Sequence, residues 1–372
     1  MPNVVVRNFF RLLRAGAFDQ KEAVEPMSPW KWGRLYQIAV MHGVAGLVAD
    51  GIDKLSDDFF LQLTPQATEK WQKTLQRIEN DNEQTNAAVA ALFDELKRLH
   101  LQPILLKGQA VAAFYPRPLH RTSGDIDIFF PDAEQAVAAE QWANENGEPP
   151  EEPERGHTTY TWHNVDVEHY AQMTTLTNPR LNRKLQAIIE EELSERLAQL
   201  PTISIGGANI ETLPPTLAML FILLRIMRYT LNEGASLKQI ADLGIYLQRR
   251  QNRIDFAKLT DWLQQLEMQR MAQLEGSLLV RLFDFSADEI PFMDGQPPAE
   301  IDKVVSDLFT INNDHHDDWY FTQGRNIFVK TNNSSAMMWH VKHSFRYFKY
   351  YPSETATNFF ISFSRSLSHI EE

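Results

Sequence analysis

Helical spacing dominates the first hundred residues. Mostly apolar side chains recur at alternating steps of four and three between residues 66 and 101, which is the spacing of one face of an α-helix. The positions that carry this repeat are Thr85, Val89, Leu92, Leu96 and Leu99. The repeat leads into a short apolar stretch at 104–106, and alanine-rich helical spacing returns at 133–146. We therefore predict helices over most of 28–100, then a strand, and later a helix that ends at Gly147.

Alternation of polar and apolar side chains replaces this spacing at Asp125-Ile-Asp-Ile128. A strand points successive side chains to opposite faces. Asp125 and Asp127 therefore share one face of the predicted strand, and the two isoleucines take the other.

A second alternating region covers 157–162 and 165–170, with His163-Asn164 between them. This pattern predicts two strands joined by a tight turn. In the second strand Asp166 and Glu168 share one face, while valines take the other.

The chain becomes wholly helical after Leu213-Pro-Pro215. Residues 216–231 are apolar nearly all round, as in a buried helix, and 302–372 is helical and rich in aromatic residues. Lys238 and Asp242 lie between, at the spacing of a structural lysine–aspartate pair. We expect an α+β fold in which a small mixed sheet is embedded in a mostly helical protein. The predicted parts are a helical region 1–80, a core 81–212 that holds the paired acids, and a helical domain 213–372.

Composition narrows the class of protein. The 36 basic and 49 acidic residues give a net charge of −13, which argues against a general nucleic-acid surface. The absence of cysteine rules out disulfides and thiolate chemistry and is compatible with the cytoplasm. The longest apolar run, 217–224, is far shorter than the about 20 residues of a membrane span. Arginines inside the apolar run 4–14 indicate an amphipathic helix rather than a signal peptide. We expect a cytoplasmic protein without a membrane span.

The paired carboxylates are the first candidate for chemistry. Two carboxylates one residue apart on a strand face repel each other, and burying them is costly unless a cation compensates. Mg²⁺ prefers oxygen ligands and often binds together with nucleotide phosphates, so Asp125 and Asp127 are candidate magnesium ligands. An exposed strand edge with two solvated acids is the alternative.

Lys107-Gly108, directly after the strand at 104–106, is the second candidate. A glycine lets the backbone approach a ligand closely. The N-terminus of the following helical segment favours negative charge, and the lysine adds a point charge. The pair therefore favours a phosphate ligand, with an ordinary turn as the alternative.

Taken in order, these segments resemble the DNA polymerase beta-like nucleotidyltransferase superfamily, and within it the uncharacterised bacterial nucleotidyltransferase family. The likeness spans about residues 101–170. It is carried by Leu105-Leu-Lys-Gly108, Tyr115-Pro116, Arg121 ahead of Gly124-Asp-Ile-Asp127, and an acidic residue within 165–168. Gln109 departs from the pattern, because the superfamily usually has serine or a second glycine there.

The resemblance implies transfer of a nucleoside monophosphate from a nucleoside triphosphate to a hydroxyl of an unidentified small-molecule or protein acceptor. Two Mg²⁺ ions, or Mn²⁺ in their place, would assist this reaction. The implied catalytic residues are Asp125, Asp127, Asp166 and Glu168, of which Asp125, Asp127 and Asp166 would bind metal. The implied nucleotide-binding residues are Lys107, Gly108, Gln109, Arg121 and Gly124.

Two questions stay open at this point. Either acid of the later strand could be the third carboxylate; we favour Asp166, which valines flank on both sides, with Glu168 in support. The alternative function is a catalytically inactive module that keeps the fold and binds a nucleotide or a protein partner.

Overall fold

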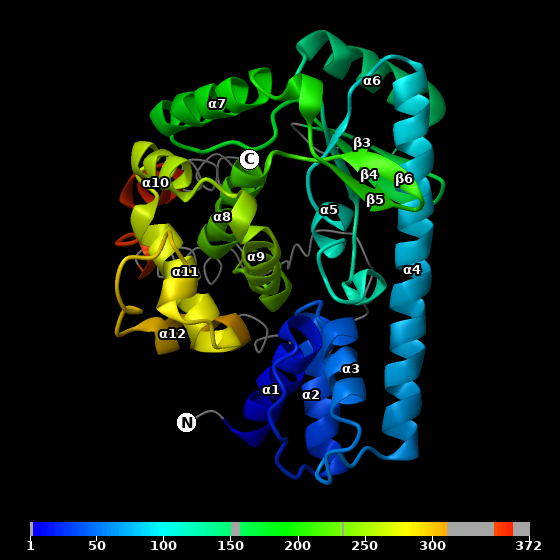
Figure 1. The fold of residues 1–372 in the computed structure, drawn as a ribbon, viewed down its shortest axis with the longest axis vertical. Helices are drawn as coiled ribbons and strands as arrows, with labels where there is room; N and C mark the ends of the chain where they lie inside the picture. Colours follow the sequence, from blue (N-terminus) through cyan, green and yellow to red (C-terminus); the bar gives the residue numbers. More distant parts are fainter. Residues whose placement is uncertain (1–2, 150–156, 233, 311–345, 360–372) are drawn as a thin grey trace, which may run out of the picture. The chain divides into compact units, whose positions relative to one another are not determined.

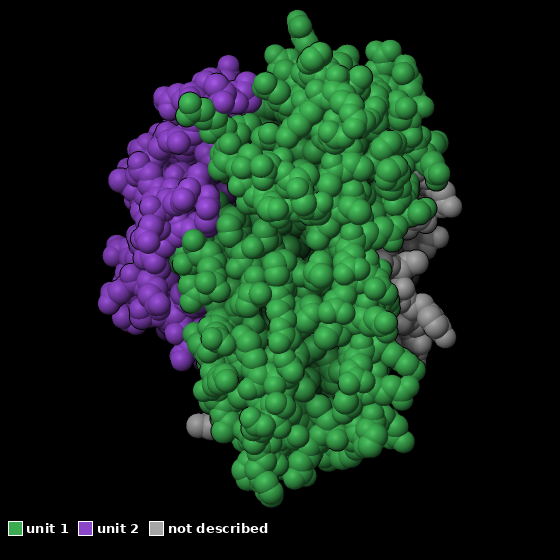
Figure 2. Space-filling view, turned by 45° about the vertical axis from the view of Figure 1, so that its right-hand side comes forward, with its two compact units in different colours: residues 1–173, 199–213, 236–249 green, residues 174–198, 214–235, 250–372 purple. Residues whose placement is uncertain are grey.

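The computed structural model describes residues 3–149, 157–232, 234–310 and 346–359, and it divides into two compact units. Unit 1 comprises 1–173, 199–213 and 236–249, and unit 2 comprises 174–198, 214–235 and 250–372 (Figure 2). Each unit is built from segments that are distant in the sequence. Residues 311–345 and 360–372 of the predicted helical region lie outside the described residues.

Three helices form the N-terminal part of unit 1: α1 (Val4–Phe18), α2 (Pro29–Met41) and α3 (Ala45–Lys54). Glycines allow α1 and α3 to pack with their backbones in close contact. A Cβ atom on Gly16 would lie 1.8 Å from the carbonyl oxygen of Leu47, and one on Gly51 would lie 1.9 Å from that of Leu12. Any larger residue at either glycine would push the two helices apart.

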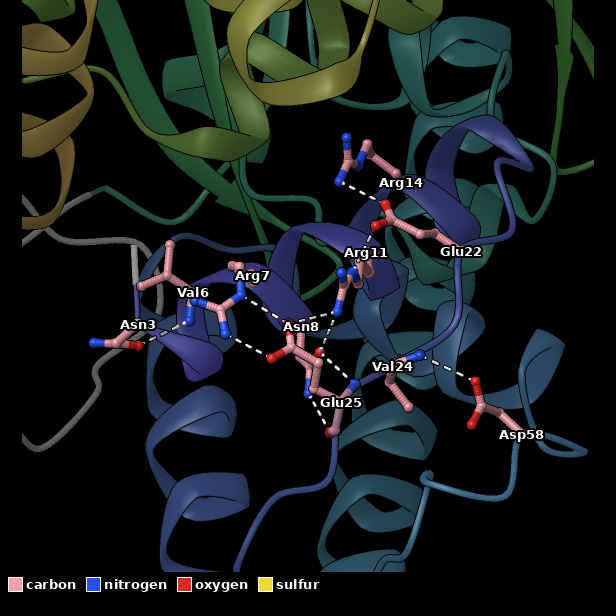
Figure 3. A network of polar contacts seen from close by, with 10 residues as sticks. All are labelled: Asn3, Val6, Arg7, Asn8, Arg11, Arg14, Glu22, Val24, Glu25 and Asp58. Carbon is pink, nitrogen blue, oxygen red and sulfur yellow. Dashed lines mark hydrogen bonds and ion pairs between the residues drawn. The ribbon is translucent and has the colours of Figure 1, made fainter. Parts of the chain in front are cut away.

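Ion pairs fasten the segment after α1 onto that helix (Figure 3). Arg7 and Arg11 both donate to the carboxylate of Glu25, at 2.6–2.8 Å, and Arg11 and Arg14 both donate to Glu22, at 2.8 and 3.1 Å. The three arginines are four and three residues apart, so they lie along one face of the helix. The predicted amphipathic helix thus uses its polar face to hold the next segment of the chain.

The long helix α4 (Pro65–Arg98) links the N-terminal helices to the sheet within unit 1 (Figure 1). Thr64 caps its start by accepting a bond from the backbone N–H of Ala67 at 3.2 Å, which satisfies one of the first unpaired N–H groups. Four of the five predicted repeat positions are buried. Leu99 is 45% exposed because it lies just past the helix end.

A four-stranded mixed sheet lies beside the C-terminal half of α4. Its strands are β1 (Ile104–Leu105), β2 (Ile126–Phe129), β3 (His157–Trp162) and β4 (Val165–Tyr170), in the order β1-β2-β4-β3. The β2–β4 pair is parallel, and the other two pairs are antiparallel. His163 and Asn164 both have positive φ, as the tight two-residue turn between β3 and β4 requires. The expected α+β fold with a small mixed sheet is confirmed.

Further elements of unit 1 complete this core. They are α5 (Gln109–Ala112), the 3₁₀ turn η1 (Pro118–His120), α6 (Ala133–Asn146), the hairpin β5 (Thr202–Ile205) and β6 (Ala208–Glu211), and α9 (Leu237–Arg250). Apolar side chains of α4 and α6 pack with Ile126 and Ile128 of β2 and with Val165 and Val167 of β4. Because strand side chains alternate, the acidic positions of β2 and β4 point to the other face of the sheet.

Unit 2 is helical in its described residues. It contains α7 (Pro179–Ser194), α8 (Pro215–Asn232), α10 (Phe256–Gln265), α11 (Gln269–Phe283), α12 (Ile301–Thr310) and a final helical stretch at 352–359. Glu354 accepts bonds from the backbone N–H groups of Thr177 and Asn178, just before α7. The buried character predicted for 216–231 is confirmed in α8. Among the helices that the structure describes, none is long and apolar enough to cross a membrane.

We predict that Glu25→Gln lowers the melting temperature at pH 7 and low salt. Hydrogen bonding to Arg7, together with the charges of Arg7 and Arg11, holds the pKa of Glu25 at about 2, well below its ordinary value. A carboxylate with a depressed pKa stabilises the folded state above its ordinary pKa, and the contribution is lost as the pH falls toward 2. The difference in melting temperature between wild type and variant should therefore shrink on acidification.

Glu83→Gln, at an exposed position of α4, is the matched control. Thermal melts between pH 7 and pH 3 measure both variants. Equal melting temperatures for the two variants at pH 7 would show that the arginine contacts of Glu25 contribute nothing.

Candidate functional site

Asp127 and Glu168 lie side by side on the face of the sheet that α4 and α6 leave uncovered. The parallel register of β2 and β4 pairs these two residues directly. Asp127 is almost fully buried, at 1% exposure, and Glu168 is 16% exposed. Two carboxylates at adjacent, poorly solvated positions require compensating positive charge.

Lys107 supplies that charge. Its Nζ atom lies 2.6 Å from Oδ1 of Asp127 and 3.7 Å from Oε2 of Glu168. The backbone places it there, because β1 pairs with β2 and the N–H of Leu106 donates to the carbonyl of Asp127 at 3.0 Å. The structure thus brings three of the predicted site residues together.

Glu168 has further partners on its own side of the sheet. The hydroxyl of Tyr170 donates to Oε2 of Glu168, and Nε2 of His157 lies 3.9 Å from Oε1. Burial acts to raise the pKa of Glu168, but the charge of Lys107 and the hydrogen bonds that Tyr170 and Asp127 make with the carboxylate outweigh it, so the pKa lies below its ordinary value. Glu168 is therefore ionised at neutral pH.

The pKa of Asp125 is shifted in the opposite direction, upward. Burial raises its pKa above the ordinary value, and the charges of Glu168 and Asp166 raise it further, while Lys107 and Lys238 offset part of the rise. The carboxyl that begins the D-x-D pair thus carries an uncompensated cost when it ionises. A bound cation would remove that cost.

Asp166, favoured by the sequence as the third carboxylate, lies on the same strand face but is exposed. Its Oδ1 accepts a bond from the hydroxyl of Thr161 at 3.0 Å, across the β3–β4 pair. Register places Glu168, not Asp166, opposite Asp127. Asp166 still acts on the site through its charge, which raises the pKa of Asp125.

Gly108 and Gln109 differ in what they offer to a ligand. Gly108 has φ +64°, a conformation that favours glycine, and a Cβ atom there would lie 3.4 Å from the carbonyl oxygen of Asp125. The side chain of Gln109 is buried and donates to Asn82 at 3.1 Å and Asn86 at 2.7 Å, both on α4. Gly108 therefore shapes the loop beside Asp125, while the Gln109 side chain anchors that loop to α4.

Arg121 is bound to an acidic partner that its sequence neighbours do not reveal. Its Nε and Nη2 atoms donate to Asp242 of α9 at 2.9 and 2.6 Å, and Tyr115 donates its hydroxyl to the same carboxylate at 2.9 Å. All three side chains are buried. The sequence suggested Asp242 as a partner for Lys238, whose Nζ lies 3.4 Å from the carbonyl oxygen of Thr122. In the sequence, the one sign of this contact was that Tyr115 and Arg121, which both bind Asp242, belong to the same motif.

Gly124 lies in open space directly before Asp125. It is exposed, and a Cβ atom built on it would meet no protein atom within 4 Å. Its φ is not in the left-handed region. Neither packing nor backbone conformation within the described structure requires glycine at this position.

The donor set agrees chemically with a magnesium site. Carboxylate oxygens are the ligands that Mg²⁺ prefers; Asp127 and Glu168 supply them from one sheet face, and Asp125 lies directly before β2. As arranged in the described residues, no three acidic or histidine side chains converge closely enough to enclose a metal ion. In this arrangement the ammonium group of Lys107 contacts the Asp127 carboxylate.

The small mixed sheet within a mostly helical chain defines an α+β protein, and its lysine and clustered acids lie on one side of that sheet. A family model described as "Uncharacterised nucleotidyltransferase" matches residues 28–284, well over half of the 372-residue chain. The chain belongs to this nucleotidyltransferase family, and membership supports nucleotidyl transfer with a nucleotide substrate. No curated protein and no solved structure matches the chain significantly.

We predict that Asp125→Asn raises the melting temperature in metal-free buffer at pH 7–8. Because the pKa of Asp125 is raised in the folded state, the folded state binds more protons than the unfolded chain above the ordinary carboxyl pKa. Ionisation of Asp125 therefore destabilises the fold as the pH rises through that range. The gain from the asparagine should vanish at pH values where Asp125 is protonated in both states.

The control is Asp166→Asn, which removes an exposed charge from the same face and should have a smaller effect. Melting curves from pH 3.5 to 8 compare the two variants. A melting temperature for Asp125→Asn below that of wild type at pH 7 would mean that the attraction of Lys107 and Lys238 exceeds the cost of burial and repulsion.

Proposed function

We propose that this protein transfers a nucleoside monophosphate from a nucleoside triphosphate to a hydroxyl group, with release of pyrophosphate. The acceptor is a small molecule or a protein. The observation that carries the proposal is that Lys107 contacts Asp127 and Glu168 on the sheet face opposite α4 and α6, with Asp125 within reach of its charge, in a chain of the nucleotidyltransferase family. The fold alone would not support an activity, because one fold serves many chemistries.

Asp125, Asp127 and Glu168 would hold Mg²⁺. When bound there, the ions would supply electrostatic stabilisation of the charge that develops on the reacting oxygens. We place Glu168 rather than Asp166 in this set because it is paired with Asp127 in register and is the less exposed of the two. The raised pKa of Asp125 supports the assignment, since a carboxylate that is costly to ionise gains most from a cation.

Lys107 and the glycines serve the triphosphate in this proposal. The ammonium group of Lys107 neutralises charge as the bond from the α-phosphorus to pyrophosphate breaks. Gly124 leaves room for phosphate oxygens to approach the backbone before Asp125. Arg121 contributes indirectly, because its buried pair with Asp242 fixes the segment that precedes Asp125.

Glu168 takes the acceptor's proton. As the acceptor oxygen bonds to the α-phosphorus, its O–H bond breaks, and the proton passes to the ionised carboxylate and then to solvent. A base must be ionised at the working pH and within hydrogen-bond reach of the hydroxyl. The lowered pKa of Glu168 meets the first condition.

The competing function is a module that binds a nucleotide or a protein without chemistry. The observation in its favour is that Lys107 already compensates Asp127 at 2.6 Å. Magnesium-dependent pyrophosphate release, tested across the four nucleoside triphosphates and a panel of hydroxyl acceptors, separates the two functions.

We predict that the double variant Asp125→Ala, Asp127→Ala loses magnesium-dependent triphosphate binding while remaining folded. The affinity loss should exceed the about 10–100-fold that even outer-shell partners of a metal cost. Titration calorimetry with and without Mg²⁺ measures it, with Asp166→Ala, which removes one exposed carboxylate from the same strand face, as the control. Unchanged magnesium-dependent affinity in the double variant would remove the metal site from the proposal.

We predict that Gly124→Val weakens triphosphate binding by at least about tenfold, or about 1.4 kcal/mol. The free energy of unfolding should change by no more than about 0.5 kcal/mol, because position 124 is exposed and a Cβ atom there has no contact within 4 Å. Calorimetry and denaturant unfolding measure the two effects separately. Normal binding by this variant would mean that the triphosphate does not approach the segment before Asp125.

A further inference from the structure

Tyr170 of β4 and His157 of β3 lie on either side of the Glu168 carboxylate. Tyr170 lies two residues after Glu168 on the same strand face, and its hydroxyl donates to Oε2. Lys107 approaches the same oxygen, at 3.7 Å. One oxygen of the carboxylate is therefore directed toward the lysine and the tyrosine.

His157 stands beside the other oxygen. It is the register partner of Tyr170 across the β3–β4 pair, and the two rings stack with centroids 5.0 Å apart and planes 19° from parallel. This stacking leaves Nε2 of His157 at 3.9 Å from Oε1 of Glu168. Since β3 and β1 are at opposite edges of the sheet, His157 lies on the side away from Lys107.

The strand order therefore separates two sides of the carboxyl cluster. Lys107, which follows β1, and Asp125, which precedes β2, lie on one side, and His157 on β3 lies on the other. Glu168 on β4 lies between them. A ligand that bridges the sheet face meets the lysine side with one end and the histidine side with the other.

Resting on the proposed function, we infer that Tyr170 and His157 are positioning residues that define the acceptor side of the site. Tyr170 fixes the rotamer of Glu168 by holding Oε2, and His157 directs the acceptor hydroxyl to Oε1. The triphosphate occupies the side of Lys107 and Gly124. A carboxylate free to rotate would lose the alignment that proton transfer needs, and misplacement by about 1 Å can cost about 100-fold in rate.

The same hairpin supplies a matched control. Tyr160 on β3 donates or accepts a hydrogen bond with His169 of β4 at 2.8 Å, and both side chains are buried on the opposite face of the sheet. Tyr160→Phe therefore deletes one hydroxyl from the same two strands without touching the carboxyl cluster. Any effect shared by Tyr160→Phe and Tyr170→Phe is an effect on the hairpin, not on Glu168.

The test measures triphosphate binding by calorimetry, and pyrophosphate release with water and with simple hydroxyl compounds as acceptors. We expect Tyr170→Phe to lower the turnover number by about 10–100-fold with little change in the KM for the triphosphate. Tyr160→Phe should leave both within about twofold of wild type. His157→Leu should raise the KM for the hydroxyl acceptor, and His157→Gln, which keeps a hydrogen-bonding side chain, should recover part of the loss.

Three results would each overturn the inference or part of it, and each has a different meaning. If wild type releases pyrophosphate and Tyr170→Phe matches Tyr160→Phe, Tyr170 does not position Glu168, and the proposed function stands. If wild type binds the magnesium–triphosphate complex without releasing pyrophosphate from it, or binds none, the proposed function fails and no acceptor side exists. A change in triphosphate affinity for His157→Leu, with acceptor KM unchanged, would move His157 to the nucleotide side.

Discussion

The forced proximity of Asp127 and Glu168 is the constraint on which the site depends. Their register is set by the other face of the same strands, where isoleucines of β2 and valines of β4 enter the core under α4 and α6. Slipping either strand by one residue would turn its apolar side chains toward solvent and its acids into the core. Hydrophobic burial on one face thus holds two carboxylates together on the other, against their mutual repulsion. The ammonium group of Lys107 offsets that repulsion by pairing with Asp127. In our proposal a bound cation offsets the remaining cost of ionising Asp125.

Local pattern was sufficient to predict the elements that carry the acids. The pattern at 157–162 and 165–170 predicted β3 and β4 with their observed bounds, and the family match over 28–284 confirms the likeness seen in about 101–170. The end of α6 at Gly147 was also predicted, and the structure shows why a glycine stands there. Gly147 has a negative φ, and glycine is needed there because a Cβ atom would lie 2.3 Å from the ring of Tyr160.

What the sequence could not supply were contacts between distant segments. Strand alternation shows that Asp166 and Glu168 share a face, but it cannot say which one lies opposite Asp127, since that depends on the register of a parallel pair. The partner of Arg121 is 121 residues away, on a helix whose place in unit 1 is fixed by tertiary packing. The assignment of the site residues to metal and nucleotide stays a prediction from motif and geometry together.

The segment that precedes Asp125 is held by a second set of charges, centred on His120. Its two ring nitrogens contact Asp50 of α3 at 2.6 Å and Glu79 of α4 at 2.8 Å. Burial acts to lower the pKa of His120, but the two carboxylates outweigh it and raise the pKa above its ordinary value. The next residue, Arg121, is paired with Asp242 in the interior. Removing one member of a buried pair such as Arg121–Asp242 leaves an uncompensated charge, at a cost of about 3–5 kcal/mol, so this pair fixes the segment's position strongly even where its net contribution to stability is small.

The two faces of the β3–β4 hairpin show how solvent exposure decides what similar side chains can do. On the covered face, Tyr160 and His169 form a hydrogen bond in the core, and burial lowers the pKa of His169 to about 4, so the imidazole stays neutral and serves packing. On the uncovered face, Tyr170 and His157 flank a carboxylate that stays ionised because a lysine and a hydroxyl stabilise its charge. Strand alternation places these two environments one residue apart. Burial on the covered face therefore offsets the destabilising repulsion between the carboxylates on the other face.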